Sequence, residues 1–424
     1  MIIKIVKDML RCKTKQQMYS KPWKALMNMQ PTGSYMRIAI VNTPCMGFGD
    51  IVFAMKLYTY LVSWYPNAEI HILTTQPQNF IKLGANPSSI VKLSASSKSS
   101  DQCRRVARLY ITDNGINIPR TDRYNLILVA PITADFEIDR KDIRDMFSNS
   151  TPFNTFFFSE YNDSVAKNFD FPTGVGNGRM GLLFTDSEPL ERLAELQNPY
   201  SLIYITDNDD HSVDCYTDFI KMVTIAQMHP VFDIVVPSWV ANDIQERESS
   251  FFNTITTYYK NIQIVNKTGI INLRVGKGPT LRFRNDILPL PYKQMQALYM
   301  YSQKQLLVTG DQSITDVLSC CNKRLVPFYQ IVPWKTNFAR NLSRKLPQKF
   351  IQKMNTSCGS IQAINYSPDM SVFMETNDFR INAKPKLDGI VASLSIPELQ
   401  NIMYMVHTGK STKSIKNKLK SIIE

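Results

Sequence analysis

Residues 36–50 read MRIAIVNTPCMGFGD, and this stretch decides the fold class that the sequence predicts. Arg37–Asn42 is a short, mostly apolar run, which predicts a buried strand. Gly47 and Gly49 predict a tight turn directly after this strand. Across Asp50–Trp64 the apolar side chains recur at helical spacing, so the turn leads into a helix. A strand, a glycine turn and a helix in this order form the start of a β-α-β unit.

Strands and helices continue to alternate on both sides of a glycine-rich segment at residues 171–183. Before that segment we expect strands at 69–74 and 124–129, and a polar loop at 94–100 (SASSKSS). After it the same pattern predicts strands at 201–206, 232–237, 262–266, 280–283, 305–309 and 325–329, with helices at 214–227, 292–302 and 313–321. This alternation predicts an α/β fold with two Rossmann-like domains that face a central cleft.

We expect the two domains to be framed by two basic ends. The domain boundary is placed near residue 190, shortly after the glycine-rich segment. Residues 1–35 would then be a basic N-terminal extension, 36–190 the first domain, 191–395 the second domain, and 396–424 a C-terminal helix with a basic tail.

The positive charge of the chain is concentrated in these ends. The chain of 424 residues holds 49 Lys and Arg against 36 Asp and Glu, a net charge of +13. Residues 1–35 carry seven basic residues and one acid, and residues 409–424 carry five and one, which together supply ten of these charges. The ends are therefore expected to contact an anionic surface or partner, while the body between them is nearly balanced.

Cysteine and histidine usage argues against metal and disulfide frameworks. The seven cysteines include no C-x-x-C pair, and the four histidines show no metal-ligand spacing. No apolar run approaches the ~18 residues that would span a membrane, and the first ten residues lack the core of a secretory signal. We expect a cytoplasmic protein with no transmembrane segment, no metal and no required cofactor.

The first candidate loop is Cys45–Asp50, which follows the first strand. Gly47 and Gly49 allow the backbone to approach a ligand closely. Asp50 stands where a carboxylate can act as a general base at the end of a parallel strand. The alternative is that Asp50 caps its helix, and the two roles are compatible.

The second candidate loop is Thr309–Ser313, between a predicted strand and a predicted helix. Gly310 permits close backbone approach, and Gln312 and Ser313 present N–H groups at the helix start, which suits a diphosphate. Asp311 is a poor phosphate ligand, but it can hold a ribose or sugar hydroxyl. The alternative is an ordinary turn in which Asp or Ser caps the helix.

Two further positions can contact charged groups. Asp207 and Asp209 lie directly after a predicted strand and can hold a cation, or they belong to a solvated acidic turn. Arg179 lies within the glycine run at residues 174–181 and can contact an anion, or the run is an interdomain linker.

The order of the parts in the second half resembles the two-domain GT-B glycosyltransferases. Ile287–Pro333 contains a Leu-Pro loop (Leu288, Pro289), a helix with the pattern M-x-x-L-Y, a strand, the loop TGDQS, a helix and a last strand. The closest resemblance is to the protein-arginine rhamnosyltransferases. Their Phe-Gly-Asp turn is matched by Phe48–Asp50, and their Gly-Glu-Asp-Ser loop is matched in position by Gly310–Ser313.

The resemblance implies a nucleotide-diphospho-sugar donor, linked to UDP or dTDP, bound by the second domain. Asp50 would be the catalytic carboxylate, Gln312 and Ser313 would face the diphosphate, and Leu288, Pro289 and Leu290 would lie beside the base. It also implies an inverting, metal-independent transferase whose acceptor, a glycan, protein or small molecule, is bound by the first domain.

The sequence departs from this family at three places. Met46 replaces an acidic residue, Leu290 replaces a Gln, and Asp311-Gln312 replaces Glu-Asp. We therefore carry over the fold and the donor class, but neither rhamnose nor arginine. Two alternatives stay open. The missing acid favours a non-catalytic protein that binds a sugar nucleotide or a partner, and the basic ends favour a DNA-modifying glucosyltransferase.

Overall fold

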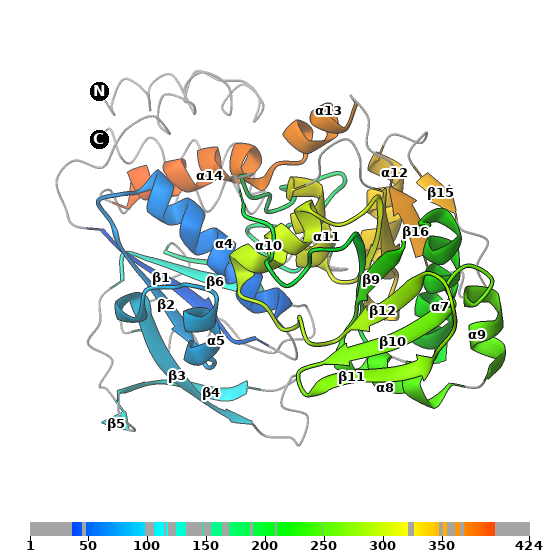
Figure 1. Cartoon of the computed structure of the whole chain (residues 1–424). Coiled ribbons are helices and arrows are strands. Elements are labelled where there is room, and N and C mark those ends of the chain that lie inside the picture. Colours follow the sequence, from blue (N-terminus) through cyan, green and yellow to red (C-terminus); the bar gives the residue numbers. More distant parts are fainter. Residues whose placement is uncertain are drawn as a thin grey trace, which may run out of the picture. The chain divides into compact units, whose positions relative to one another are not determined.

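The structure is a computed structural model of the chain (Figure 1). It describes residues 36–44, 48–97, 106–113, 116–117, 124–132, 147, 154–162, 169–186, 190–207, 210–247, 249–320, 326–346, 351–353, 361–364 and 369–394. The chain divides into two compact units, residues 1–183 with 376–424 and residues 184–375. Each unit is an α/β structure with its own sheet, so the α/β class predicted from the sequence is confirmed.

The first unit holds a sheet in the order β5-β4-β3-β2-β1-β6-β7. The strands from β3 to β7 along this order are parallel, whereas β4 and β5 pair antiparallel at one edge. The strand order reverses between β1 and β6, as in a Rossmann-like sheet. The strands are β1 (Arg37–Asn42), β2 (Glu69–Thr74), β3 (Ile90–Ser97), β4 (Val106–Asp113), β5 (Ile116–Asn117), β6 (Leu126–Ile132) and β7 (Thr155–Ser159).

The central strand β1 has the bounds that its apolar run predicts. Ile38, Ala39 and Ile40 are fully buried because helices and loops cover both faces of a parallel sheet. Its register with β2 runs from Arg37↔Glu69 to Asn42↔Thr74. Both predicted strands are therefore confirmed over their whole length.

Helix α4 (Gly49–Trp64) follows β1 and covers one face of this sheet. Its buried residues Ile51, Ala54, Leu57 and Leu61 recur at the helical spacing seen in the sequence. The helix contacts β1, β2 and β6 (Figure 1). It therefore places its N-terminus beside the carboxyl end of β1.

The chain returns to the first unit at helix α14 (Phe379–Ser393). The Phe379 ring stacks on Tyr60 of α4 at 6.3 Å between centroids and lies 6.0 Å from Phe158 of β7. The Tyr65 hydroxyl donates to Asp388 Oδ1 at 2.9 Å. These contacts fix α14 to α4 and to the edge of the sheet.

The second unit holds a sheet in the order β11-β10-β12-β9-β8-β13-β14-β16-β15. The strands from β10 to β14 along this order are parallel, and the order reverses between β8 and β13. The strands are β8 (Tyr200–Tyr204), β9 (Val231–Val235), β10 (Asn261–Asn266), β11 (Gly269–Arg274), β12 (Thr280–Arg284), β13 (Gln305–Val308), β14 (Val326–Gln330), β15 (Ile351–Lys353) and β16 (Ile361–Ile364).

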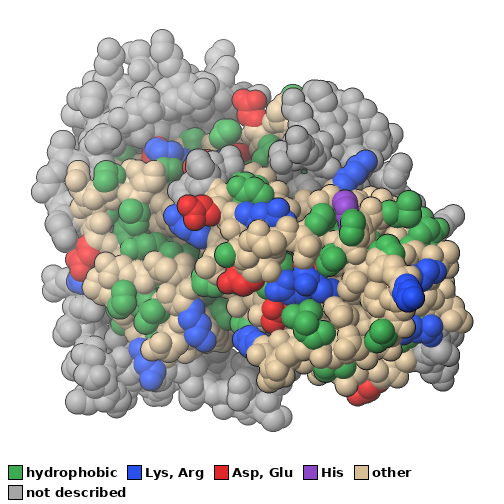
Figure 2. Space-filling model, in the orientation of Figure 1, with side chains coloured by type: hydrophobic (Ala, Val, Ile, Leu, Met, Phe, Trp, Pro, Cys, Tyr) green, Lys and Arg blue, Asp and Glu red, His purple; other side chains and the backbone are tan. Residues whose placement is uncertain are grey.

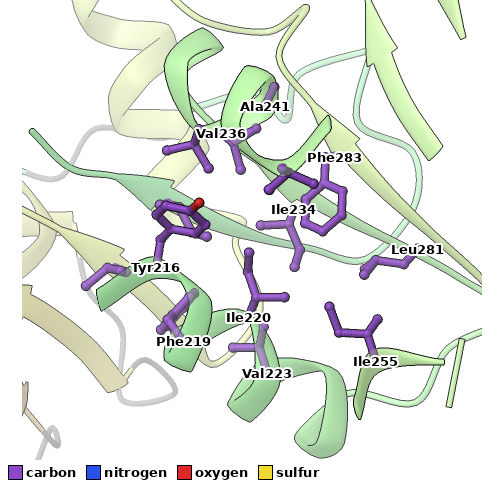
Figure 3. Close-up of a cluster of buried hydrophobic side chains, with 14 of the residues drawn as sticks. Tyr216, Phe219, Ile220, Val223, Ile234, Val236, Ala241, Ile255, Leu281 and Phe283 are labelled. Carbon is purple, nitrogen blue, oxygen red and sulfur yellow. The ribbon is translucent and has the colours of Figure 1, made fainter. Parts of the chain in front are cut away.

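Two groups of helices cover the faces of this second sheet. Helices α7 (Asp210–Ala226), α8 (Ser238–Glu246) and α9 (Ser249–Ile255) share one core with β9, β10 and β12. Figure 3 shows side chains of α7, β9 and β12 that point toward one another in this core. Helices α10 (Tyr292–Met300) and α11 (Asp311–Cys320) pack together on the opposite face (Figure 1). Right-handed crossovers on the two sides of an order reversal produce this arrangement.

Four expectations differ from the structure or lie outside the described residues. The polar loop expected at 94–100 is wrong for its first four residues, because β3 continues to Ser97 by backbone pairing with β4. Helix α7 begins at Asp210, four residues before its apolar spacing starts. The late helix expected within residues 396–424 and the extension at 1–35 lie outside the described residues.

A lysine on α14 is held among apolar neighbours in the first unit. The Lys386 ammonium donates to the Asp170 carbonyl oxygen and lies 4.7 Å from the centre of the Phe171 ring. Burial lowers the pKa of Lys386 to about 8, and the nearby Asp170 only partly offsets this effect. The charged lysine therefore costs the folded state stability at neutral pH.

The pH dependence of stability tests this environment. Below pH 8 Lys386 is protonated in both the folded and the unfolded chain, so the cost of burying its charge is fully present. Between about pH 8 and 10.5 the unfolded chain binds more protons than the folded chain, so the free energy of unfolding rises with pH. Between these limits we expect the unfolding free energy of the wild type to gain up to about 3 kcal/mol relative to Lys386→Met. Urea denaturation of both proteins at each pH measures the difference.

The matched control is Lys384→Met on the same helix, because the Lys384 side chain is 40% exposed and pairs with Asp388 at the surface. Its stability relative to the wild type should change by less than about 1 kcal/mol over the same pH range. An equal pH response in both variants would contradict the buried environment of Lys386.

Candidate functional site

The candidate site of the second unit lies at the carboxyl edge of its sheet, where the strand order reverses. β8 and β13 are the neighbours at this reversal, and the Thr309 N–H extends their ladder by donating to the Tyr204 carbonyl at 2.9 Å. Ligands of open α/β sheets bind beyond the strand ends at such a reversal. The predicted loop at 309–313 and Asp207 both follow these two strands.

A buried glutamine at the end of β14 ties the loops of this edge together. The Gln330 amide accepts from the Thr206 N–H at 3.3 Å and donates to Ser212 Oγ at 3.1 Å. The Thr309 hydroxyl donates to the Gln330 carbonyl at 3.2 Å. The side chain of Gln330 thus fixes the loop after β8 and the start of α7, and its main-chain carbonyl fixes the loop after β13.

Gly310 forms the turn between β13 and α11. Its φ of +85° lies in the left-handed region that favours glycine, and a Cβ there would meet no atom within 4 Å. The helix begins at Asp311, and its first helical bond runs from the Ile314 N–H to the Gly310 carbonyl at 3.2 Å. Gly310 therefore directly precedes the first residue of the helix.

The start of α11 offers hydrogen-bond donors to an anion. The N–H groups of Asp311, Gln312 and Ser313 belong to the first turn of α11, where backbone N–H groups point toward the helix end. The helix dipole adds partial positive charge at the same end. Together with the open space before Gly310, this arrangement can hold a phosphate group.

Asp311 lies in an ion pair that the sequence analysis did not predict. Its Oδ2 atom is 2.9 Å from the Lys335 ammonium, and the two side chains are only 10% and 14% exposed. Lys335 ends a short 3₁₀ helix, η3 (Pro333–Lys335), in the loop that follows β14. The rule that selected the other loops, position directly after a parallel strand, could have selected this loop as well.

Helices α10 and α11 are joined at the level of the candidate loops. The Tyr292 hydroxyl donates to Asp316 Oδ1 at 2.9 Å. The Ser313 side chain hydrogen-bonds Tyr299, whose pKa burial raises well above its usual value. The Ser313 hydroxyl therefore links α11 to α10, while the Ser313 backbone N–H lies in the first turn of α11.

The Leu-Pro loop leads directly into α10. Leu288 and Leu290 are part-buried and Pro289 is exposed. Because α10 packs on α11, the fold brings the helix after the Leu-Pro loop against the helix after Gly310.

The acidic residues after β8 form no described cluster. Asp207 is exposed at the end of the strand, and Asp209 lies outside the described residues. Within the described part of the chain, no three His, Cys, Asp or Glu residues are grouped so that they could hold a metal ion.

In the first unit, Gly49 and Asp50 lie in the first turn of α4. The preceding residue, Phe48, makes no side-chain cap, so Asp50 is inside the helix rather than at its cap position. The buried Asn42 amide donates to the Asp50 carbonyl at 3.2 Å and to the Ala130 carbonyl of β6 at 2.9 Å. Asp50 therefore stands where the strand order of this sheet reverses, and Gly47 lies outside the described residues.

The glycine run with Arg179 is a packed part of the first unit. Gly174 and Gly181 exchange backbone hydrogen bonds at 2.9 Å, and the Asn162 side chain bonds both polar groups of Val175. Arg179 Nη1 donates to the Thr173 carbonyl at 3.4 Å. The run therefore lies within the first unit, and the interpretation of it as an interdomain linker is wrong.

Two glycines of this run give a matched test of its packing. Gly178 (φ +73°) and Gly181 (φ +97°) both have positive φ, but only an added Cβ at Gly181 would clash, at 2.2 Å from the Asn377 carbonyl oxygen. Gly178→Ala should cost about 1–2 kcal/mol of backbone strain. Gly181→Ala should cost about 4 kcal/mol or more by chemical denaturation. Equal costs would mean that the run does not pack against residue 377.

Comparison of the sequence with models of known protein families and with curated proteins gives no match. Function must therefore be argued from the geometry of the two candidate loops. Among the helices of the described ranges, none combines the length and the apolar character needed to cross a membrane.

Proposed function

We propose that the protein is a glycosyltransferase with two GT-B-type domains that transfers a sugar from a UDP- or dTDP-linked donor to an acceptor. The observation that carries the proposal is the open, positive-φ Gly310 turn, which leads into α11 at the order reversal of a parallel sheet. A turn of this kind lets a diphosphate approach the backbone and accept its N–H groups.

The donor would lie along the carboxyl edge of the second sheet. Its base would contact Leu288–Leu290, and its diphosphate would accept the N–H groups at Gly310–Ser313. The joined helices α10 and α11 support this arrangement, because they hold the two loops in a fixed relation. Asp311 would act mainly through Lys335, since its carboxylate is already in an ion pair.

Asp50 would act as the general base at the other order reversal. It would take the proton of an acceptor hydroxyl or amide, whose oxygen or nitrogen then bonds to the anomeric carbon. The bond from that carbon to the diphosphate oxygen breaks, and the diphosphate leaves with the electron pair. Helix N–H groups would stabilise its charge without a metal, and the anomeric centre would invert.

We place this activity in the cytoplasm, with the basic termini contacting an anionic surface or partner. Cys215 and Cys320 are buried and neither is disulfide-bonded, which supports a reducing compartment. The acceptor class, whether a glycan, a protein or a small molecule, is left to experiment.

Two other functions remain alternatives to the proposal. Met46, which stands in place of an acid, favours a non-catalytic protein that binds a sugar nucleotide. The basic ends favour a DNA-modifying glucosyltransferase. On the face seen in Figure 2, the described Lys and Arg side chains form small separate groups with Asp and Glu among them. Binding to duplex DNA that weakens steeply with salt and requires the two ends would support the second alternative.

Donor binding can be tested by thermal stability with UDP, dTDP and GDP. A nucleotide at a hundred times its Kd should stabilise the folded protein by roughly 2.7 kcal/mol. Gly310→Asp should abolish the shift, because a carboxylate would then repel the phosphates. Gly178→Asp is the matched control, since it is also an open, positive-φ glycine. Absence of any nucleotide shift in the wild type would contradict the proposed donor.

Asp50→Asn should abolish sugar transfer and leave donor binding unchanged within about threefold, because the amide cannot accept the acceptor proton. The measurement is release of UDP or dTDP from the sugar nucleotide in the presence of acceptor extracts. Asp207→Asn, which changes an exposed acid in the loop after β8, should retain the activity. Full transfer by Asp50→Asn would exclude Asp50 as the base, and binding without turnover by the wild type would favour the non-catalytic alternative.

A further inference from the structure

Lys335 brings a positive charge to the start of α11 from a separate loop. Its ammonium lies 2.9 Å from Asp311 Oδ2, in the first turn of the helix that follows Gly310. The lysine side chain is only 14% exposed, so its position is restricted. A cation therefore stands at the same sheet edge as the helix N–H groups.

The surroundings of this ion pair strengthen its electrostatic effect. Tyr329 of β14 is fully buried and packs edge-on against Phe338 of α12 (Thr336–Lys345) with 6.0 Å between ring centroids. Burial raises the pKa of Tyr329 well above its usual value, and the charges of Asp311 and Lys335 act on it in opposite directions. Because neighbouring aromatic rings exclude water, the charge of Lys335 is less screened than on an open surface.

The Tyr329 hydroxyl is the second sign of a built polar site. It has no hydrogen-bond partner among the described residues, although it is fully buried. Unsatisfied buried hydroxyls are rare, because each costs about 1–3 kcal/mol. Its proximity to the charges of Asp311 and Lys335 places this unused donor at the start of α11.

An ammonium can serve Asp311 and a ligand at the same time. A lysine ammonium carries three N–H donors, so its bond to Asp311 Oδ2 does not exclude a second bond to a ligand. The carboxylate would thus position the ammonium rather than contact the donor itself.

The order of the strands in the second sheet predicts which loop would lie beside which part of a bound nucleoside diphosphate. The Leu-Pro loop follows β12, the Gly310 loop follows β13, and Lys335 follows β14. Along the sheet these strands occur in the order β12, β9, β8, β13, β14, so Lys335 lies beyond Gly310 as seen from the Leu-Pro loop. With the base beside Leu288–Leu290, the phosphate nearer the sugar would extend toward β14.

We propose that Lys335, positioned by Asp311, binds the sugar-side phosphate of the donor and makes the site selective for nucleoside diphosphates over monophosphates. This inference rests on the proposed function and names the residue that recognises its leaving group. Lys335 would hold the departing diphosphate by a charge-assisted hydrogen bond.

The test compares the affinity of Lys335→Gln for UDP and UMP, or for dTDP and dTMP, with that of the wild type. Isothermal titration should show that the wild type binds the diphosphate about tenfold or more tightly than the monophosphate. Lys335→Gln should lose about tenfold in diphosphate affinity and less than about threefold in monophosphate affinity. Lys335→Arg should recover part of the loss, because the positive charge is kept.

The control is Lys345→Gln, which removes the same charge from an exposed position of α12 and should change neither affinity. Should Lys335→Gln fold poorly because Asp311 loses its partner, the double variant Lys335→Gln with Asp311→Asn removes both charges and should show the same loss of selectivity. A merely structural role would change both affinities alike, so the ratio is the decisive quantity.

The possible outcomes separate the inference from the proposed function. If the wild type binds the diphosphate and Lys335→Gln keeps the wild-type ratio, the assignment of Lys335 is wrong and the donor site stands. If the wild type binds neither nucleotide, the donor site itself is wrong, and the inference falls with it. A selective loss of diphosphate affinity supports both.

Discussion

Burial of both faces of two parallel sheets is the constraint on which the other features depend. Strands such as β1 and β8 are enclosed by helices, so most of their side chains are apolar. Parallel strands also send every following loop to the same edge. The loops that follow the parallel strands of each unit therefore meet at one edge of its sheet, and both candidate loops lie at such an edge.

At that edge of the second unit, loops distant in the sequence are fixed by a few buried polar contacts. Gln330 joins the loop after β8 to the loop after β13, and the ion pair of Asp311 with Lys335 joins the latter to the loop after β14. Each contact leaves a costly unsatisfied group if one partner is removed. The loops are consequently held in place before any ligand binds, which is the condition for preorganised binding of a charged group.

The sequence predicted what depends on local periodicity and missed what depends on neighbours in space. β1, β2 and α4 were predictable because apolar residues recur at strand or helix spacing. The Gly310 turn was predictable because glycine follows an apolar run and precedes a helical one. The extension of β3 to Ser97 was not, since pairing with β4 rather than side-chain character stabilises it. Lys335 and Gln330 were missed because their roles require knowing that β14 lies beside β13.

The two candidate loops, one at each reversal of strand order, differ in their chemistry. The loop at Asp50 offers a carboxylate in the first turn of α4, whose main-chain carbonyl accepts from Asn42, and a carboxylate suits removal of a proton. The loop at Gly310 offers N–H groups and an ammonium, which suits an anionic leaving group. The proposed transfer reaction needs both functions, and an ammonium in contact with the carboxylate would lower its basicity. Under this proposal the base at Asp50 and the anion site at Gly310 follow strands of two separate sheets.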